Sequence, residues 1–403
     1  MLPFVAHAAR QPVVPSARPK AGGKPAPGFA AHLSAAHGRV AERRQVRQRV
    51  ATNPIPVHDD WATVAHARYA QPTIRPPGSY VRTARHHVTP TGPVRSVRGV
   101  PSAPSMPEAV PSTGSRDALD LGAYPRPLHD NGRGLHWIPT TSQSPEAVDR
   151  FVEQAKQMHA SWVVFLNDAA NVGANDYLVK KLVAAGIEPV MRIYTPGVGA
   201  VPGDVEGMVR HYTGLGVHYF QIGNEPNLRD ENGGAAPDVD RFLDGWIPAA
   251  RAVAAAGGLP GLAPMAPNGD VDDRRFLRAA LEGLKARRAL DVLDRGWIAL
   301  HNYVRHDGSG FSAFRDYDAI ARGVLGRSLP IIGTEGGTTA GNWQDDVSDM
   351  KYMARDHEPY FFANTLWVLA NKAGGGHDPQ WEKHALIRDD GASPVVDALR
   401  TMA

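Results

Sequence analysis

Residues 220–227 read FQIGNEPN, an apolar run that becomes polar at its end. The apolar residues up to Gly223 are typical of a buried β-strand. The strand then ends in an amide, a carboxylate and a proline, which are Asn224, Glu225 and Pro226. Because a buried carboxylate is costly unless its charge is used or paired, we expect Glu225 to have a function or a partner at the end of this strand.

Eight short apolar runs follow one another from about residue 115 onward, and amphipathic segments separate them. The predicted strands cover residues 134–138, 162–166, 189–194, 218–223, 261–266, 297–303, 330–335 and 364–370. Between them lie helix signals such as Ser144-Pro145, an N-cap followed by proline at the first helical position, and Ser393-Pro394 opens the last helix.

Strands that alternate with helices pair in parallel, so the chain belongs to the α/β class. Eight such units in residues 116–403 match a (β/α)8 TIM barrel in number and length. A doubly wound open sheet is the alternative. It is disfavoured because the first strand and the residues after it read GLHWIPTT, which contains no glycine-rich phosphate loop.

Residues 1–115 differ from the rest of the chain in composition. They hold 17 of the 34 prolines, and 15 Lys and Arg face four acidic residues, whereas the remainder carries 29 basic and 37 acidic residues. Such a segment buries too little apolar area to offset its ordering entropy, which predicts a disordered basic tail. Its charge serves solubility, or else it tethers the protein to an anionic polymer or surface; both interpretations stay open.

The chain has no cysteine, which excludes disulfides, zinc-thiolate sites and cysteine nucleophiles. We expect no transmembrane segment, because no run of 18 apolar residues occurs. The N-terminus lacks the apolar stretch of a secretory signal. The sequence therefore does not identify the localisation of the protein.

Two carboxylates stand at predicted strand ends, Glu225 after the fourth strand and Glu335 at the end of the seventh. In a TIM barrel the functional residues lie at the carboxyl ends of the strands, so both should face the same mouth. A pair of carboxylates about 5 to 5.5 Å apart is what a retaining glycosidase uses, one as acid/base and the other as nucleophile.

At these positions the sequence resembles the clan A glycoside hydrolases. FQIGNEPNL is similar to their strand-four signature, and its wording is nearest to the family of β-xylosidases and α-iduronidase. PIIGTEGG (330–337) resembles the strand-seven segment that holds the nucleophile, ALHNY (299–303) resembles the strand-six His-x-Tyr, and Trp367 resembles the strand-eight tryptophan. Gly223, Gly336 and Gly337 depart from the bulkier residues usual there, so the resemblance does not carry a substrate specificity.

The resemblance implies a role for each matching residue. Glu225 would be the acid/base and Glu335 the nucleophile, with Tyr303 hydrogen-bonded to Glu335. Asn224 would hydrogen-bond the sugar 2-hydroxyl. His301 would line the site beside Glu225, and Trp367 would contact a sugar ring.

Three further residues at strand ends are candidates for substrate binding, each with a structural alternative. Arg192 orients a carboxylate or substrate, or forms a structural ion pair. Trp137 lines the site or packs in the barrel, and Asn167 contacts substrate or caps a helix. We expect no metal and no cofactor, since no metal-binding motif is present and this mechanism requires neither.

The leading hypothesis is a retaining glycoside hydrolase that cleaves a β-linked oligo- or polysaccharide. Two other classes remain open at this point. One is a barrel that binds a glycan without cleaving it, and the other is a nucleic-acid or envelope-associated protein anchored by its basic tail.

Overall fold

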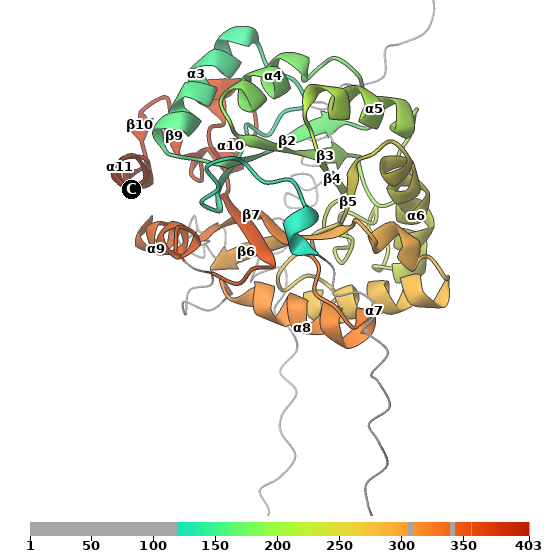
Figure 1. Cartoon of the computed structure of the whole chain (residues 1–403). Coiled ribbons are helices and arrows are strands. Elements are labelled where there is room, and N and C mark those ends of the chain that lie inside the picture. Colours follow the sequence, from blue (N-terminus) through green and yellow to red (C-terminus); the bar gives the residue numbers. More distant parts are fainter. Residues whose placement is uncertain (1–119, 305–309, 339–342, 356, 403) are drawn as a thin grey trace, which may run out of the picture. The chain divides into compact units, whose positions relative to one another are not determined.

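The computed structural model describes residues 120–304, 310–338, 343–355 and 357–402. The predicted tail (1–115), its partners and the domain boundary at its end lie outside the described residues. Eight parallel strands form a closed barrel in which each pairs with the next and β8 pairs with β1 (Figure 1). The strands are β1 (Arg133–His136), β2 (Trp162–Asp168), β3 (Glu188–Tyr194), β4 (Tyr219–Ile222), β5 (Leu259–Leu262), β6 (Trp297–Val304), β7 (Ile331–Thr338) and β8 (Phe361–Leu366). The predicted (β/α)8 barrel is therefore confirmed.

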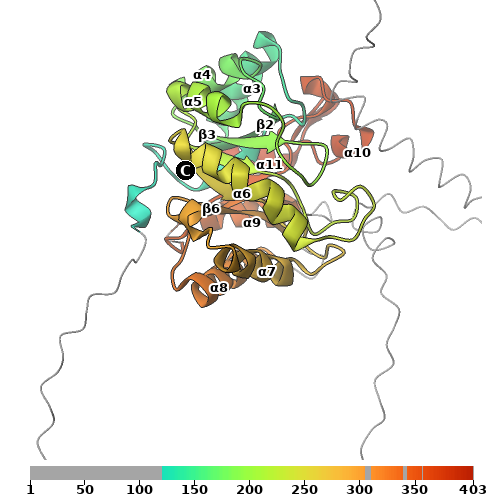
Figure 2. The ribbon, with the colours of Figure 1, turned by 90° about the vertical axis from the view of Figure 1, so that its right-hand side faces the viewer.

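Helices cover the outside of the strands, and Figure 2 looks onto α6, which packs on β4 and β5. The helices are α3 (Pro145–Gln157), α4 (Asp176–Ala184), α5 (Val205–Leu215), α6 (Val239–Ala255), α7 (Asp273–Ala286), α8 (Ala313–Leu325), α9 (Trp343–Met353), α10 (Pro379–Glu382) and α11 (Pro394–Thr401). Short 3-10 turns (Leu121–Ala123, Leu290–Leu293, Lys372–Gly374) and a small antiparallel pair, β9 (Ile387–Arg388) with β10 (Gly391–Ala392), complete the described chain.

The predicted helix caps are present. The Ser144 hydroxyl accepts a hydrogen bond from the Ala147 backbone N–H at 3.2 Å, and Ser393 caps α11 in the same way. Each cap satisfies a backbone donor that the first helical turn leaves unpaired. None of the helices in the described part of the chain has the length and hydropathy that crossing a bilayer requires.

The amino-terminal half of the barrel is filled with apolar side chains, many of them large. This buried cluster consists of Tyr124, Trp162, Val164, Val190, Tyr219, Leu259, Trp297, Ala299, Ile332, Phe362 and Ala363. Tyr124, from the segment that precedes β1, donates to the Gly296 carbonyl at 3.0 Å and closes this end. Because these side chains fill the amino-terminal half of the barrel, we expect a polar site at its carboxyl end.

Alternation along the strands places the polar side chains in the upper layer. On β3, Val190 lies in the inner cluster, so Arg192 faces inward as well. The β6–β7 pairing skips Thr334, since Leu300 pairs with Gly333 and His301 pairs with Glu335. This bulge shifts the alternation and turns Glu335 toward His301.

β1, β5 and β8 end before their predicted ranges do, whereas β2 and β7 continue beyond theirs. β5 ends at Leu262 rather than at residue 266, because Pro264 has no N–H to give to the ladder. The Pro264 carbonyl instead accepts a hydrogen bond from the Glu225 N–H at 2.9 Å. β8 ends at Leu366 rather than at residue 370, since the next backbone N–H groups bond to Gly336 and His384.

Candidate active site

The mouth of the barrel brings together side chains from strands β3, β6 and β7 and from the turn after β4. These are Arg192, Glu225, His301, Tyr303 and Glu335, all of which the sequence predicted at strand ends. Their hydrogen bonds, together with a 3.4 Å contact between His301 and Glu335, form one connected group, so residues up to 143 positions apart in sequence are neighbours.

Glu335 is held from three sides. Its Oε1 atom lies 2.6 Å from Nη1 of Arg192 and 3.4 Å from Nε2 of His301, and its Oε2 accepts a hydrogen bond from Tyr303 at 2.7 Å. Burial alone would raise the pKa of this carboxyl, but His301 and Arg192, together with the Tyr303 hydrogen bond, outweigh burial and hold the pKa below its usual range. Glu335 is therefore ionised at neutral pH.

The Tyr303 hydroxyl remains a donor. Burial, followed by the charge of Glu335, raises the pKa of Tyr303 well above its usual value. The phenol consequently keeps its proton over the whole range in which the protein would work, and it stabilises the ionised form of Glu335.

Glu225 differs from Glu335 in exposure and in its partners. Its side chain is 20% exposed, against 11% for Glu335, and its Oε1 lies 2.7 Å from Nδ1 of His301. Its Oε2 makes no hydrogen bond with the described residues. Glu225 also has a positive φ of 37°, a conformation that is rare outside glycine and that clusters at functional sites. One carboxylate oxygen is thus free to exchange a proton with a ligand.

His301 connects the two glutamates. Its ring is fully buried, with Nδ1 toward Glu225 and Nε2 toward Glu335. A single imidazole that touches both carboxylates fixes their relative position at the barrel mouth.

Two residues of the site were missed from the sequence. His136, at the end of β1, is fully buried, and its ring centroid lies 4.2 Å from that of Trp367. Burial lowers the pKa of His136 to about 3, so the imidazole is neutral. The signal that could have found it is its position in the first predicted strand, which the structure ends at His136.

The second missed residue is Glu231, which lies six positions after Glu225 on the loop that follows β4. Its Oε1 accepts a hydrogen bond from Nδ2 of Asn224 at 2.9 Å. Burial, with a smaller contribution from the charge of Glu225, raises the pKa of Glu231 to about 7 against the opposing Asn224 hydrogen bond. No strand-end rule identifies it, since it stands inside a polar loop.

Trp367 follows directly after β8 and is half-buried at the mouth. Its ring packs against Trp381 of α10 at 5.2 Å between centroids, in an edge-to-face arrangement. The two indoles form an aromatic wall on the β8 side of the site.

Two predicted contact residues are placed elsewhere by the structure, and both predictions are corrected here. Trp137 is fully buried and packs edge-to-face on Phe151 of α3, so it belongs to the core. Asn167 is also fully buried; it donates to the Ala169 and Asn171 carbonyls and accepts from Asn175. Asn167 therefore organises the β2–α4 loop through these bonds, a role that differs from both the expected substrate contact and the expected helix cap.

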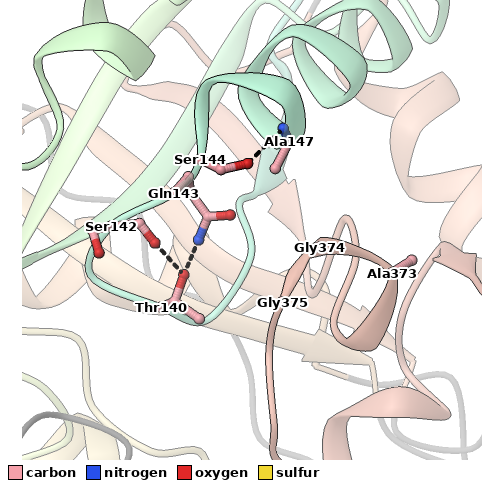
Figure 3. A pocket seen from close by; sticks show the side chains of 8 residues that line it. All are labelled: Thr140, Ser142, Gln143, Ser144, Ala147, Ala373, Gly374 and Gly375. Carbon is pink, nitrogen blue, oxygen red and sulfur yellow. Dashed lines mark hydrogen bonds between the residues drawn. The ribbon is translucent and has the colours of Figure 1, made fainter.

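A shallow hollow of about 360 Å³ opens at the same end of the barrel, between the loops after β1 and β8 (Figure 3). It is lined by Thr140, Ser142, Gln143, Ser144, Ala147, Ala373, Gly374 and Gly375. The Thr140 hydroxyl bonds to the Ser142 carbonyl at 3.0 Å and to the Gln143 amide, so one wall is polar while the other is small and apolar.

Within the described ranges, no group of three or more His, Asp or Glu side chains is arranged to hold a metal ion.

Comparisons with known proteins add the following findings. No family model matches the chain, and no curated protein matches it. Among solved structures it is similar to a GH39 β-xylosidase from Caulobacter crescentus (TM-score 0.48, 15% identity, 70% of this chain and 73% of that one). It is also similar to a GH39 enzyme from Xanthomonas axonopodis pv. citri (TM-score 0.48, 15% identity, 70% and 68% covered). A third is a GH128 endo-β-1,3-glucanase from Pseudomonas viridiflava (TM-score 0.45, 16% identity, 68% and 98% covered).

All three of these structures belong to glycoside hydrolases. At this level of identity and TM-score they assign no activity to this chain. Its function is therefore argued from the side chains at the strand ends.

Proposed function

We propose that the protein is a retaining glycoside hydrolase that cleaves a β-linked oligo- or polysaccharide by double displacement. One observation carries this proposal. Two carboxylates at the carboxyl ends of β4 and β7 touch the same imidazole of His301, yet only Glu335 is clamped by Arg192 and Tyr303. Pairs of carboxyl groups in different environments are how one site supplies both an acid and a nucleophile.

In the first step, an oxygen of Glu335 attacks the anomeric carbon while the bond to the leaving-group oxygen breaks. Glu225 gives its proton to that oxygen through Oε2, which has no partner among the described residues. The products are the free leaving alcohol and a covalent glycosyl ester on Glu335.

In the second step, water replaces the leaving group. Glu225, now ionised, takes a proton from the water as its oxygen attacks the anomeric carbon, and the ester bond to Glu335 breaks. Glu335 leaves as a carboxylate that Arg192 and Tyr303 stabilise. Two inversions at the same carbon retain the configuration.

Substrate contacts are assigned to the side chains around this pair. Asn224, next to Glu225, would hydrogen-bond the sugar 2-hydroxyl, an interaction that strengthens in the transition state. Trp367 would present its ring to the sugar in the same subsite. The hollow between the β1 and β8 loops, which opens at the same end of the barrel, would accept a further unit of a longer glycan.

The experiment is hydrolysis of a panel of aryl β-glycosides and of β-glucan, xylan, mannan and galactan by the full chain. Glu225→Gln and Glu335→Gln are assayed in parallel, with Glu206→Gln on the exposed face of α5 as a control. The proposal expects turnover of at least one substrate that both site variants lose and the control keeps. Turnover that survives in Glu335→Gln would contradict the assignment of the nucleophile.

A further inference from the structure

Glu231 is a third carboxylate of the site, and the double-displacement mechanism does not use it. The loop after β3 fixes its backbone, because the Glu231 carbonyl accepts a hydrogen bond from the Val198 N–H at 2.8 Å. A β-carbon at Gly197 would lie 2.8 Å from the same carbonyl oxygen, so the two loops can approach only with glycine there. Glu231 is thus held firmly beside Asn224.

The contact between Glu231 and Asn224 decides which way the Asn224 amide points. Nδ2 of Asn224 donates to Oε1 of Glu231 at 2.9 Å, and above the raised pKa of Glu231, about 7, the ionised carboxylate can only accept and so maintains this orientation. Oδ1 of Asn224 then points away from Glu231. It is buried and has no hydrogen-bond partner among the described residues, although a buried acceptor without a partner is unfavourable.

Oδ1 of Asn224 therefore lacks a hydrogen-bond donor among the described residues. Asn224 directly precedes Glu225, and the charges of Glu225, Glu335 and Arg192 all act on Glu231. The missing donor is consequently best supplied by a sugar bound beside the two catalytic carboxylates.

We propose that Glu231 is a positioning and specificity-determining residue. Its carboxylate orients the Asn224 amide so that the amide oxygen accepts a hydrogen bond from the substrate. The site consequently selects β-glycosides with a hydrogen-bond donor at the 2-position. This inference rests on the proposed function. It adds that the 2-position of the sugar must donate a hydrogen bond. With the opposite orientation of the Asn224 amide, the site would select a hydrogen-bond acceptor at that position.

The test compares a β-glycoside that the enzyme hydrolyses with its 2-deoxy analogue, in wild type, Glu231→Met and Glu231→Gln. Methionine has nearly the length of glutamate but cannot hold the amide, whereas glutamine keeps an acceptor oxygen. We expect Glu231→Met to lower kcat/KM for the 2-hydroxy substrate about 10- to 100-fold, mainly through kcat, and to change the 2-deoxy substrate less than about threefold. Glu231→Gln should retain most of the discrimination, and the Glu206→Gln control should match wild type.

A purely structural role of Glu231 would give a different pattern. Glu231→Met would then lower kcat/KM for both substrates by the same factor, in step with a loss of thermal stability. That result, or an unchanged preference for the 2-hydroxy substrate in Glu231→Met, would overturn the proposal.

A second readout does not depend on turnover. The side-chain amide resonances of Asn224 are followed by NMR in protein labelled with ¹⁵N-asparagine and are assigned by their absence in Asn224→Asp. If Glu231 holds the amide, these resonances shift with an apparent pKa near 7 in wild type and lose that transition in Glu231→Gln. Glu225, Glu335, Arg192 and Tyr194 also act on this region, so any transition left in Glu231→Gln belongs to them.

The two readouts separate two kinds of failure. If no glycoside is turned over, the proposed function fails, while the NMR titration still decides whether Glu231 orients Asn224. If glycosides are hydrolysed but the Asn224 resonances are the same in wild type and in Glu231→Met, the inference alone is overturned.

Discussion

Nη1 of Arg192 lies 2.6 Å from Oε1 of Glu335, although the two residues are 143 positions apart in the sequence. Both side chains are about nine-tenths buried, at 9% and 11% exposure. A buried ion pair gains little over an apolar pair, but the loss of one partner leaves an uncompensated charge. Arg192 thus serves to keep Glu335 ionised in surroundings that would otherwise protonate it.

Replacing Arg192 by methionine should therefore shift the pH dependence of activity. In wild type the pKa of Glu335 lies below its usual value of 4.5, so the acid limb that reports this group in kcat/KM lies below pH 4.5. Without Arg192, one of the groups that hold the pKa of Glu335 down is lost and the pKa rises, so we expect the limb to move upward by at least about one unit. Arg192→Lys, which keeps the charge, should move it less. An unchanged limb in Arg192→Met would show that Arg192 does not set the charge of Glu335.

We expect the hydrogen bond from Tyr303 to Glu335 to raise kcat about 10- to 100-fold. Hydrogen bonds to charged groups contribute about 1.5–3 kcal/mol, and 1.36 kcal/mol corresponds to a factor of ten. We expect Tyr303→Phe to lose activity by that factor in steady-state kinetics, because the departing carboxylate is less stabilised. The matched control is Tyr317→Phe, which removes a phenol that bonds to Asp273 between α8 and α7. Equal loss of kcat in both variants would mean that the effect is one of stability.

The strand pattern predicted most of this arrangement. The alternation of apolar runs and helix caps suffices to predict a barrel, and in a barrel Glu225 and Glu335 must converge at the same end. His301 and Tyr303 were expected there only from the resemblance to the clan A glycoside hydrolases. The offsets of β5 and β8 and the bulge at Thr334 were not predictable, since they depend on which neighbouring backbone supplies each hydrogen bond.

The misassigned and missed residues have a common cause. Trp137 and Asn167 stand at strand ends like the site residues, but one points to α3 and the other to its own loop, and sequence position does not distinguish these directions. Glu231 belongs to a loop whose path is fixed by a contact with a different loop, at Val198. Such contacts between loops leave no periodic signal.

Two buried aspartates should lower the free energy of unfolding of the barrel as the pH rises above about 4. On α9, burial raises the pKa of Asp349 to about 8 and that of Asp346 to about 7, both from a usual value of 3.8. The folded state then keeps protons that the unfolded chain has released, so unfolding becomes easier between about pH 4 and pH 8. We expect Asp349→Asn to raise the melting temperature by about 2 to 4 °C at pH 8, the shift that about 1 kcal/mol produces, and to raise it less at pH 5. The control is Asp397→Asn on the surface of α11, and a similar gain in both variants would contradict a role for burial.

The central claim is that Glu335 forms a covalent bond with the substrate while Glu225 exchanges the proton. The most direct measurement is incubation of the full chain with 2-deoxy-2-fluoro-β-glycosyl fluorides of xylose, glucose, galactose and mannose, followed by intact-mass and peptide mass spectrometry. We predict one added fluoroglycosyl group per chain, on the peptide that contains Glu335, and none on Glu335→Gln. A label on any other residue, or an enzyme that hydrolyses its substrate with inversion of the anomeric configuration, would contradict the account.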